Sequence, residues 1–120
     1  MKNKLLTSGI ALLILAGCST GAKLGNVSIP GSASDVANNE LGRNKQLRYT
    51  VSGNMDSACA DQFALATAAN FKTTEEPTKE DMHMKNTFND GTNDLVIVCT
   101  EQKDGDKLIG TRVTLTMMAN

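Results

Sequence analysis

Side chains that could catalyse a reaction or bind a metal ion are few in this chain and form no recognisable constellation. His83 is the only histidine, and although Glu80 and Asp81 precede it, no second imidazole or thiolate ligand lies nearby. Catalysis by serine, histidine and aspartate would need this histidine beside an activated serine, but the sequence has no nucleophile-elbow motif. We therefore expect His83 to be a solvated side chain, and we predict neither a catalytic residue nor an enzyme.

Two other patterns could suggest metal binding, but each has a simpler interpretation. Asp104-Gly105-Asp106 resembles part of a calcium loop, yet the remaining ligands of an EF-hand are absent. This run predicts a turn. Methionine thioethers can bind copper, but they more often fill gaps in an aliphatic core, which we expect of Met82, Met84, Met117 and Met118. We expect no metal site and no cofactor.

Cys18 is the one residue whose surroundings specify a chemical modification. Two lysines within Met1–Lys4 precede an almost wholly apolar run, the layout of a secretory signal. That run has about 11 residues, well short of the ~20 that a transmembrane helix needs, so a cleaved signal is favoured. Leu15-Ala16-Gly17-Cys18 matches the lipobox of bacterial lipoproteins. The match implies cleavage before Cys18 and acylation of its thiol and amine, and two or three acyl chains anchor a protein stably.

The residues after Cys18 suggest where the protein resides and how the chain is organised. Ser19 stands where aspartate would retain an enterobacterial lipoprotein in the inner membrane, so the resemblance favours the outer membrane, facing the periplasm or the surface. Serine, glycine, alanine and asparagine then dominate up to residue 45, a composition typical of a flexible tether. We expect a signal peptide at 1–17, a lipidated tether at 18–45 and a small domain at 46–120.

Once Cys18 is acylated, two of the three cysteines remain, Cys59 and Cys99. Exported domains fold in an oxidising compartment, so the pair is a candidate disulfide. Closing that loop would stabilise the domain by about 4 kcal/mol in the chain-entropy model. Two buried free thiols are the alternative. The charge is slightly negative and no basic patch is present, so we expect no nucleic-acid partner.

Periodicity within the domain predicts a small α+β fold. Apolar residues alternate with polar ones at 46–52 and 107–117, and the apolar run at 95–99 indicates a central strand. Asp104-Gly105 marks a hairpin with a loop somewhat longer than two residues. Thr78–Asp90 has a capping-box-like start and the apolar pair Met84 and Phe88, which predicts a helix. The stretch 57–71 fits a helix or an irregular loop equally. We expect an antiparallel or mixed sheet of three to four strands with the 78–90 helix on one face.

One stretch resembles a known family. Gly91-Thr92-Asn93-Asp94 followed by Leu95–Val98 looks like the "GANAVV" signature of small envelope lipoproteins. That signature recurs in lipoproteins similar to the outer-membrane sensor of the Rcs phosphorelay and in YbjQ-like domains. The resemblance implies a helix leading into a Gly-x-Asn turn, then a hydrophobic strand and its hairpin partner. It covers only Thr78–Val98, and Thr92 and Asp94 replace the usual alanines.

These features favour a membrane-anchored envelope lipoprotein that binds another envelope protein, for stress sensing or as an assembly factor. A phage- or plasmid-encoded lipoprotein that blocks a receptor or transfer machine fits the sequence equally, whereas an enzyme or metal-handling protein fits poorly. The sheet face opposite the helix should carry Arg48 and Arg112 among threonines. This face is either ordinary polar exterior or the partner-binding surface, with the two arginines as anchors.

Overall fold

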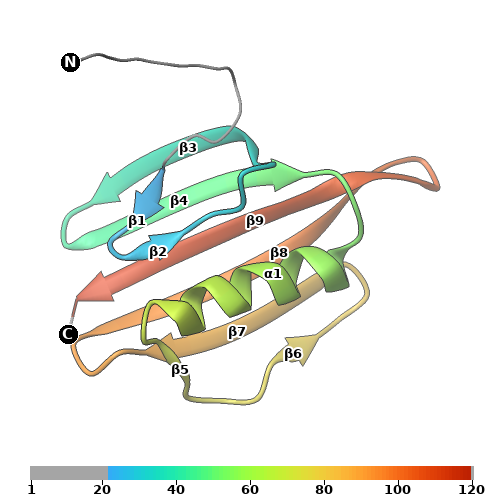
Figure 1. The fold of residues 1–120 in the computed structure, drawn as a ribbon. Helices are drawn as coiled ribbons and strands as arrows, with labels where there is room; N and C mark the ends of the chain where they lie inside the picture. Colours follow the sequence, from blue (N-terminus) through green and yellow to red (C-terminus); the bar gives the residue numbers. More distant parts are fainter. Residues whose placement is uncertain (1–21, 120) are drawn as a thin grey trace, which may run out of the picture.

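The computed structural model describes residues 22–119, which form one large antiparallel sheet, a small hairpin and one helix (Figure 1). The sheet has seven strands in the order β3-β4-β9-β8-β7-β5, with β6 also pairing with β7. The bounds are β1 Lys23–Leu24, β2 Val27–Ser28, β3 Ser34–Leu41, β4 Asn44–Val51, α1 Met55–Ala68, β5 Lys72–Thr73, β6 Thr78–Lys79, β7 His83–Asn89, β8 Asn93–Asp104 and β9 Lys107–Ala119.

The expected fold class is therefore wrong in the size of the sheet and in the place of the helix. The sheet has seven strands instead of three or four, and most described residues lie in strands. The segment 78–90 is not a helix but the short strand β6 and the longer strand β7. Met84 and Phe88 do share a face, because residues four apart lie on the same side of a strand as well as of a helix.

The expected tether at 18–45 is also wrong in its described part. Three strands, β1, β2 and β3, lie between Lys23 and Leu41. Leu24 and Val27 are buried in the core. Apolar side chains that are isolated in the sequence thus pack against a surface supplied by distant strands. Residues 18–21, including Cys18, lie outside the described residues, as does the signal peptide.

The helix is α1, within the stretch for which the sequence allowed either helix or loop. Asn54 caps it, because its side-chain oxygen accepts a hydrogen bond from the Ser57 backbone N–H at 2.8 Å. The buried side of the helix is mostly small, with Ala58, Cys59 and Ala66 against the sheet. Small residues allow the helix to approach the strands closely.

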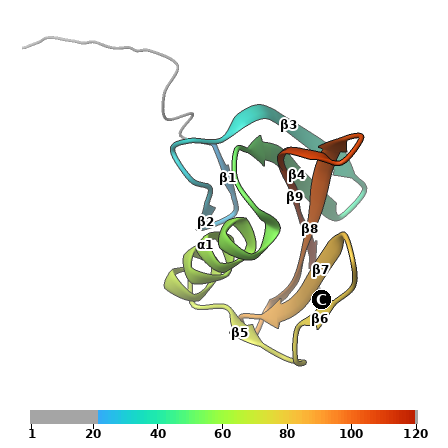
Figure 2. The same ribbon diagram turned by 90° about the vertical axis from the view of Figure 1, so that its right-hand side faces the viewer.

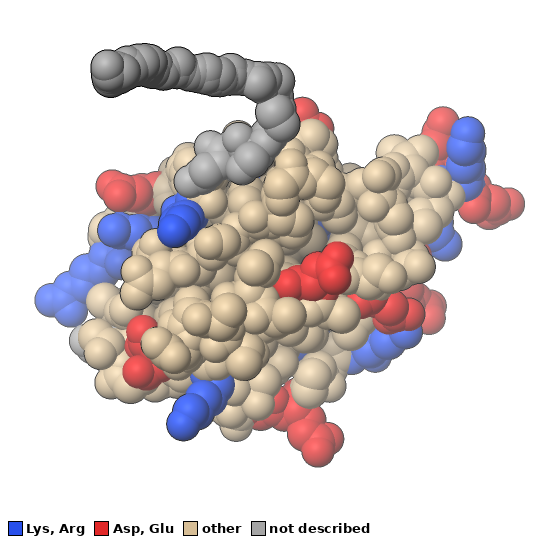
Figure 3. All heavy atoms as spheres, viewed as in Figure 1, with Lys and Arg blue, Asp and Glu red and all other residues tan. Residues whose placement is uncertain are grey.

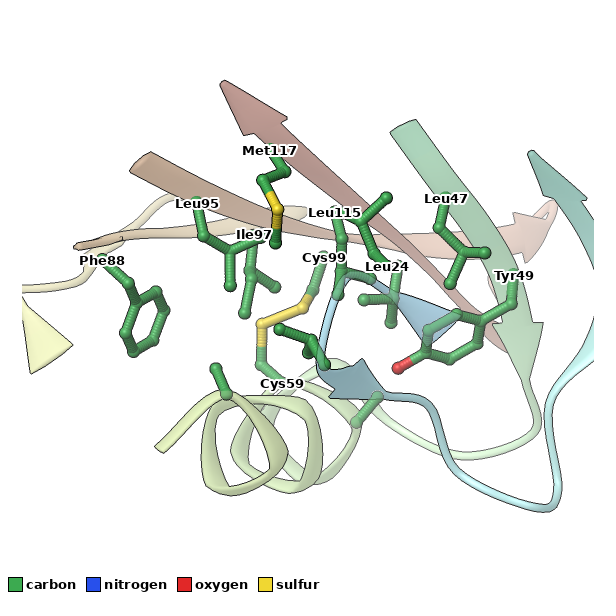
Figure 4. Packing of buried hydrophobic residues seen from close by; sticks show 14 of the residues in the cluster. Leu24, Leu47, Tyr49, Cys59, Phe88, Leu95, Ile97, Cys99, Leu115 and Met117 are labelled. Carbon is green, nitrogen blue, oxygen red and sulfur yellow. A yellow bond between two sulfur atoms is a disulfide. The ribbon is translucent and has the colours of Figure 1, made fainter. Parts of the chain in front are cut away.

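One face of the sheet is covered and holds the core (Figures 2 and 4). The helix packs on β8, β9 and β7, and the β1–β2 hairpin packs beside it over β4. The core side chains come from alternate positions of the strands, as the pleat requires, and include Leu47, Tyr49, Phe88, Leu95, Ile97, Val113 and Leu115. The hairpin and the helix together thus cover the apolar face.

The two cysteines of the domain lie in this core and form a disulfide. Cys59 of α1 and Cys99 of β8 are bonded, with their Cα atoms 5.9 Å apart and both side chains fully buried. The bridge therefore fastens the helix to a central strand, which is the pairing predicted from the sequence.

The β8–β9 hairpin is present where Asp104-Gly105 predicted it, with a tighter connection than expected. Asp104 pairs with Lys107, so the loop has two residues. Gly105 occupies the first of them at φ +65°, a conformation that costs glycine little. Both strands continue beyond their neighbours in the sheet, since β4 ends opposite Thr111 and β7 begins opposite Thr100. The resulting arm projects from the sheet in Figure 1.

Candidate docking surface

Within residues 22–119, neither the helix nor the β1–β2 hairpin lies over the second face of the sheet. We call it the open face, and the strand register arranges its side chains in three rungs across five strands. The rungs are Ser34, Thr50, Arg112, Thr100 and His83; Ala37, Arg48, Thr114, Val98 and Lys85; and Asn39, Gln46, Thr116, Val96 and Thr87. On the central strands β4, β9 and β8, the open-face residues alternate with residues of the core. The centre of the open face is threonine and valine, most of them half-buried.

Arg48 and Arg112 lie on this face on the neighbouring strands β4 and β9. Arg48 pairs with Thr114 and Thr50 pairs with Arg112, so the two arginines are diagonal neighbours. Such neighbours have Cα atoms about 7–8 Å apart. Within residues 22–119, the only ion pairs join Lys79 to Asp56 and Lys103 to Glu101. Both arginines are therefore exposed cations without an acidic partner in that part of the chain.

Lys85 adds a third cation to the open face on β7, and His83 lies two residues before it on the same side of the strand. Lys85 lies in the same rung as Arg48, and His83 lies in the same rung as Arg112. The His83 ring nitrogen Nδ1 is 3.2 Å from the Thr100 hydroxyl, directly across the strand pair. His83 is thus an exposed surface residue, though on a strand and not on the helix that the sequence predicted.

A groove of about 380 Å³ adjoins the open face at the base of the arm. Its lining brings together Arg112 and Thr50 of the open face with Ile109 of the arm and Asp35 of β3. The Thr50 hydroxyl donates to the Asp35 carboxylate at 3.3 Å and lies 3.1 Å from the Ser34 hydroxyl. The lining of the groove thus combines a cation, an exposed apolar side chain and a carboxylate.

Gly110 permits this arrangement. A Cβ atom at Gly110 would lie 2.6 Å from the Val51 carbonyl oxygen, far inside contact distance. Only glycine lets β9 pass so near the end of β4 where it leaves the arm. Leu108 and Ile109, just before it, are large apolar residues that the arm leaves exposed. The sequence pattern did not single them out, because their exposure depends on β9 continuing past the edge of its neighbours.

The two groups with shifted pKa values, Tyr49 and Asp90, have structural roles and do not line the groove. Burial raises the pKa of the Tyr49 phenol, and the Asp61 carboxylate raises it further. In the β7–β8 turn, hydrogen bonds from the backbone N–H groups of Asn93 and Thr92 lower the pKa of the Asp90 carboxyl. The first group stabilises the core and the second stabilises a turn.

The remaining sequence candidates do not converge on one site. No group of three or more histidine, cysteine, aspartate or glutamate side chains in residues 22–119 could hold a metal ion. Asp104 and Asp106 flank the tight turn of the arm. Met84 lies opposite Cys99, whereas Met117 and Met118 lie at the opposite end of the sheet, beside Lys45 and Asn44. The helix that the family resemblance implies before Gly91 is the strand β7.

Comparison with protein-family models, curated protein sequences and solved structures finds no match for this chain. In the described part of the chain, no helix has the length and apolar character needed to cross a membrane.

Proposed function

We propose that this chain is a lipid-anchored protein of the bacterial outer membrane whose domain binds another envelope protein without catalysing a reaction. The observation that carries the proposal is the open face, where Arg48 and Arg112 lie as diagonal neighbours with no acidic partner in the described residues. The lipobox at Leu15–Cys18 supports the anchor.

The chemistry of the open face suits recognition of an acidic protein surface. Arginine is enriched at binding hot spots and pairs with carboxylates through two parallel hydrogen bonds. Thr114 and Val98, which lie beside Arg48 in its rung, present short β-branched side chains. Such side chains lose little rotamer freedom when a partner covers them. A partner with carboxylates spaced to match the two arginines would gain both specificity and a faster approach.

Photo-crosslinking in intact cells tests this proposal. A photoreactive amino acid replaces Thr114, which pairs with Arg48 and lies two residues from Arg112 on β9, or the exposed Asp61 on α1 as the control position. We expect a crosslinked partner from position 114 and not from position 61. Arg48→Glu with Arg112→Glu should abolish that crosslink. The matched control Lys72→Glu with Lys107→Glu changes the charge equally at exposed sites away from the arginine pair and should retain it.

Two measurements separate loss of binding from loss of structure or anchoring. Both charge-reversed proteins should unfold within about 0.5 kcal/mol of the wild type, because surface substitutions seldom cost more. Both should incorporate labelled palmitate, whereas Cys18→Ala should not. A crosslink at 114 that survives reversal of both arginines would remove the open face as the docking surface. Palmitate in the Cys18→Ala protein would contradict the anchor.

A further inference from the structure

The distance between the anchor and the first strand is short. Strand β1 begins at Lys23, five residues after Cys18. Five residues span at most about 18 Å when fully extended. If Cys18 carries lipid, as the proposed function holds, Lys23 stays within that distance of the membrane surface whatever conformation the intervening residues adopt. The domain is therefore held at the bilayer, with β1 on the near side.

The surface beside β1 has the composition of a membrane contact. Strand β3 ends at Leu41, just before the β3–β4 turn, and Leu41 is 61% exposed, the most exposed large hydrophobic side chain of residues 22–119. Arg43 and Lys45 follow it, and Lys45 lines a groove of about 300 Å³ together with Lys23 of β1. No ion pair joins these three cations to a described residue.

The charge of this surface is positive overall. Glu40 also lines the groove and pairs in register with Lys45, so one acidic residue stands among three cations. Figure 3 shows lysine and arginine side chains gathered over β1 and the β3–β4 turn. Leu41 lies at the tip of the β3–β4 hairpin, next to the turn that carries Arg43, whereas Lys45 points to the other side of the same hairpin, toward Lys23. A hairpin tip of this kind can place its apolar side chain in the headgroup layer while the cations on either side of it contact lipid phosphates.

We propose that the β3–β4 turn docks on an anionic lipid surface, with Leu41 inserted among the headgroups and Lys23, Arg43 and Lys45 contacting phosphates. This inference rests on the lipid anchor. The anchor confines the domain near the bilayer, so a contact too weak to bind membranes alone is sufficient to orient it. The β3–β4 turn would thus face the membrane, whereas the anchor alone would allow the domain to rotate.

Docking at this turn also sets the direction of the arm. Strand β4 runs from Asn44, near the turn, to Val51, at the groove beside Arg112. Seven residue steps along a strand span about 24 Å. The β8–β9 arm and its groove therefore face away from the bilayer, where a partner protein can reach them.

Tryptophan fluorescence in vesicles tests the orientation, because the chain has no tryptophan of its own. Leu41→Trp and Ile109→Trp place one reporter at each end, at positions exposed by 61% and 59%. The full lipidated proteins are inserted into vesicles of phosphatidylethanolamine and phosphatidylglycerol with brominated acyl chains, which quench nearby tryptophan. We expect quenching at position 41 and none at position 109.

Charge variants and neutral vesicles make the test specific. Arg43→Glu with Lys45→Glu in the Leu41→Trp protein should abolish most of the quenching, as should replacing phosphatidylglycerol with phosphatidylcholine. If the proteins float with the vesicles but position 41 is unquenched, or both positions are quenched equally, the orientation is wrong and the anchor stands. If the wild-type protein does not float with the vesicles, the anchor is wrong and the orientation falls with it.

Discussion

The two faces of one sheet have opposite characters although they share the same strands. On the covered face, Leu47, Ile97 and Leu115 are fully buried beneath the helix and the β1–β2 hairpin. On the open face, the residues next to them in sequence are Arg48, Val98 and Thr114, and they are exposed or half-buried. Because strand side chains alternate, a change of one position moves a substitution from the core to the surface. We therefore expect stability to depend on the covered face and partner binding on the open face.

The largest effect should come from the disulfide, which belongs wholly to the covered face. Replacing both Cys59 and Cys99 with alanine releases a loop with a sequence separation of 40. The chain-entropy model gives a loss of about 4 kcal/mol in the free energy of unfolding for such a loop. Guanidinium unfolding of the oxidised wild type and the double variant measures it, with the chemically reduced wild type as control. Equal midpoints for all three proteins would show that the bridge does not stabilise the domain.

Adjacent residues on β8 compare the two faces directly. Ile97 is fully buried and Val98 lies half-buried on the open face. Ile97→Ala should lower the free energy of unfolding by about 2–5 kcal/mol, because it leaves a cavity in the core. Val98→Ala removes two methyl groups that already contact solvent, so about 1 kcal/mol is expected. Denaturant unfolding of both variants measures the difference, and a larger loss from Val98→Ala would overturn the assignment of the faces.

The strands that form this comparison were the part of the fold that the sequence predicted well. Apolar and polar residues alternate in both strands, with Leu47, Tyr49 and Val51 in one and Val113, Leu115 and Met117 in the other. The alternation is clear because the side chains of the open face contact solvent and can be polar. The same alternation placed Arg48 and Arg112 on one face. The strand register then brought them together as diagonal neighbours, which periodicity alone could not show.

Strands β3 and β7 were missed for a physical reason. Strand β3 is exposed along nearly its whole length, so no apolar period marks it, and only Val36 is half-buried. In β7, the buried positions are Asn86 and Phe88, with Met84 half-buried. The polar Asn86 interrupts the two-residue period, and the remaining pair, four residues apart, fits a helix equally well. Poor helix formers such as Thr87 and Asn89 were the contrary signal.

The sequence did not distinguish a helix from a loop at 57–71, because the buried side of the helix has few apolar residues. Gln62 occupies a fully buried position on it, between small residues. A glutamine there is satisfied only by contacts that are distant in sequence. Its side-chain oxygen accepts from the Tyr49 hydroxyl, and its nitrogen donates to the Ser28 carbonyl at 3.0 Å. Sequence periodicity does not reveal such partners, although they join β4, α1 and β2.

The smallest predicted effect on the covered face concerns this polar contact. Tyr49→Phe removes the hydroxyl that donates to the Gln62 oxygen at 2.6 Å and leaves that oxygen buried without its partner. The expected loss in the free energy of unfolding is about 1–3 kcal/mol. Denaturant unfolding at neutral pH measures the loss, and Thr114→Val on the open face serves as a control that should change stability little. No loss from Tyr49→Phe would mean that the hydrogen bond is not formed.

The pH dependence of stability provides a second, independent test of the burial of Tyr49, which is the only tyrosine in the chain. Because burial raises the pKa of its phenol, the folded state holds the proton more tightly than the unfolded state does. The contribution to stability is thus complete below the unfolded pKa of about 10 and declines as the pH rises above it. Unfolding measured from pH 8 to pH 11 should show a steeper loss for the wild type than for Tyr49→Phe, since lysine titration is common to both proteins. Identical slopes would place the phenol in water, and the covered face would then have to admit solvent at β4.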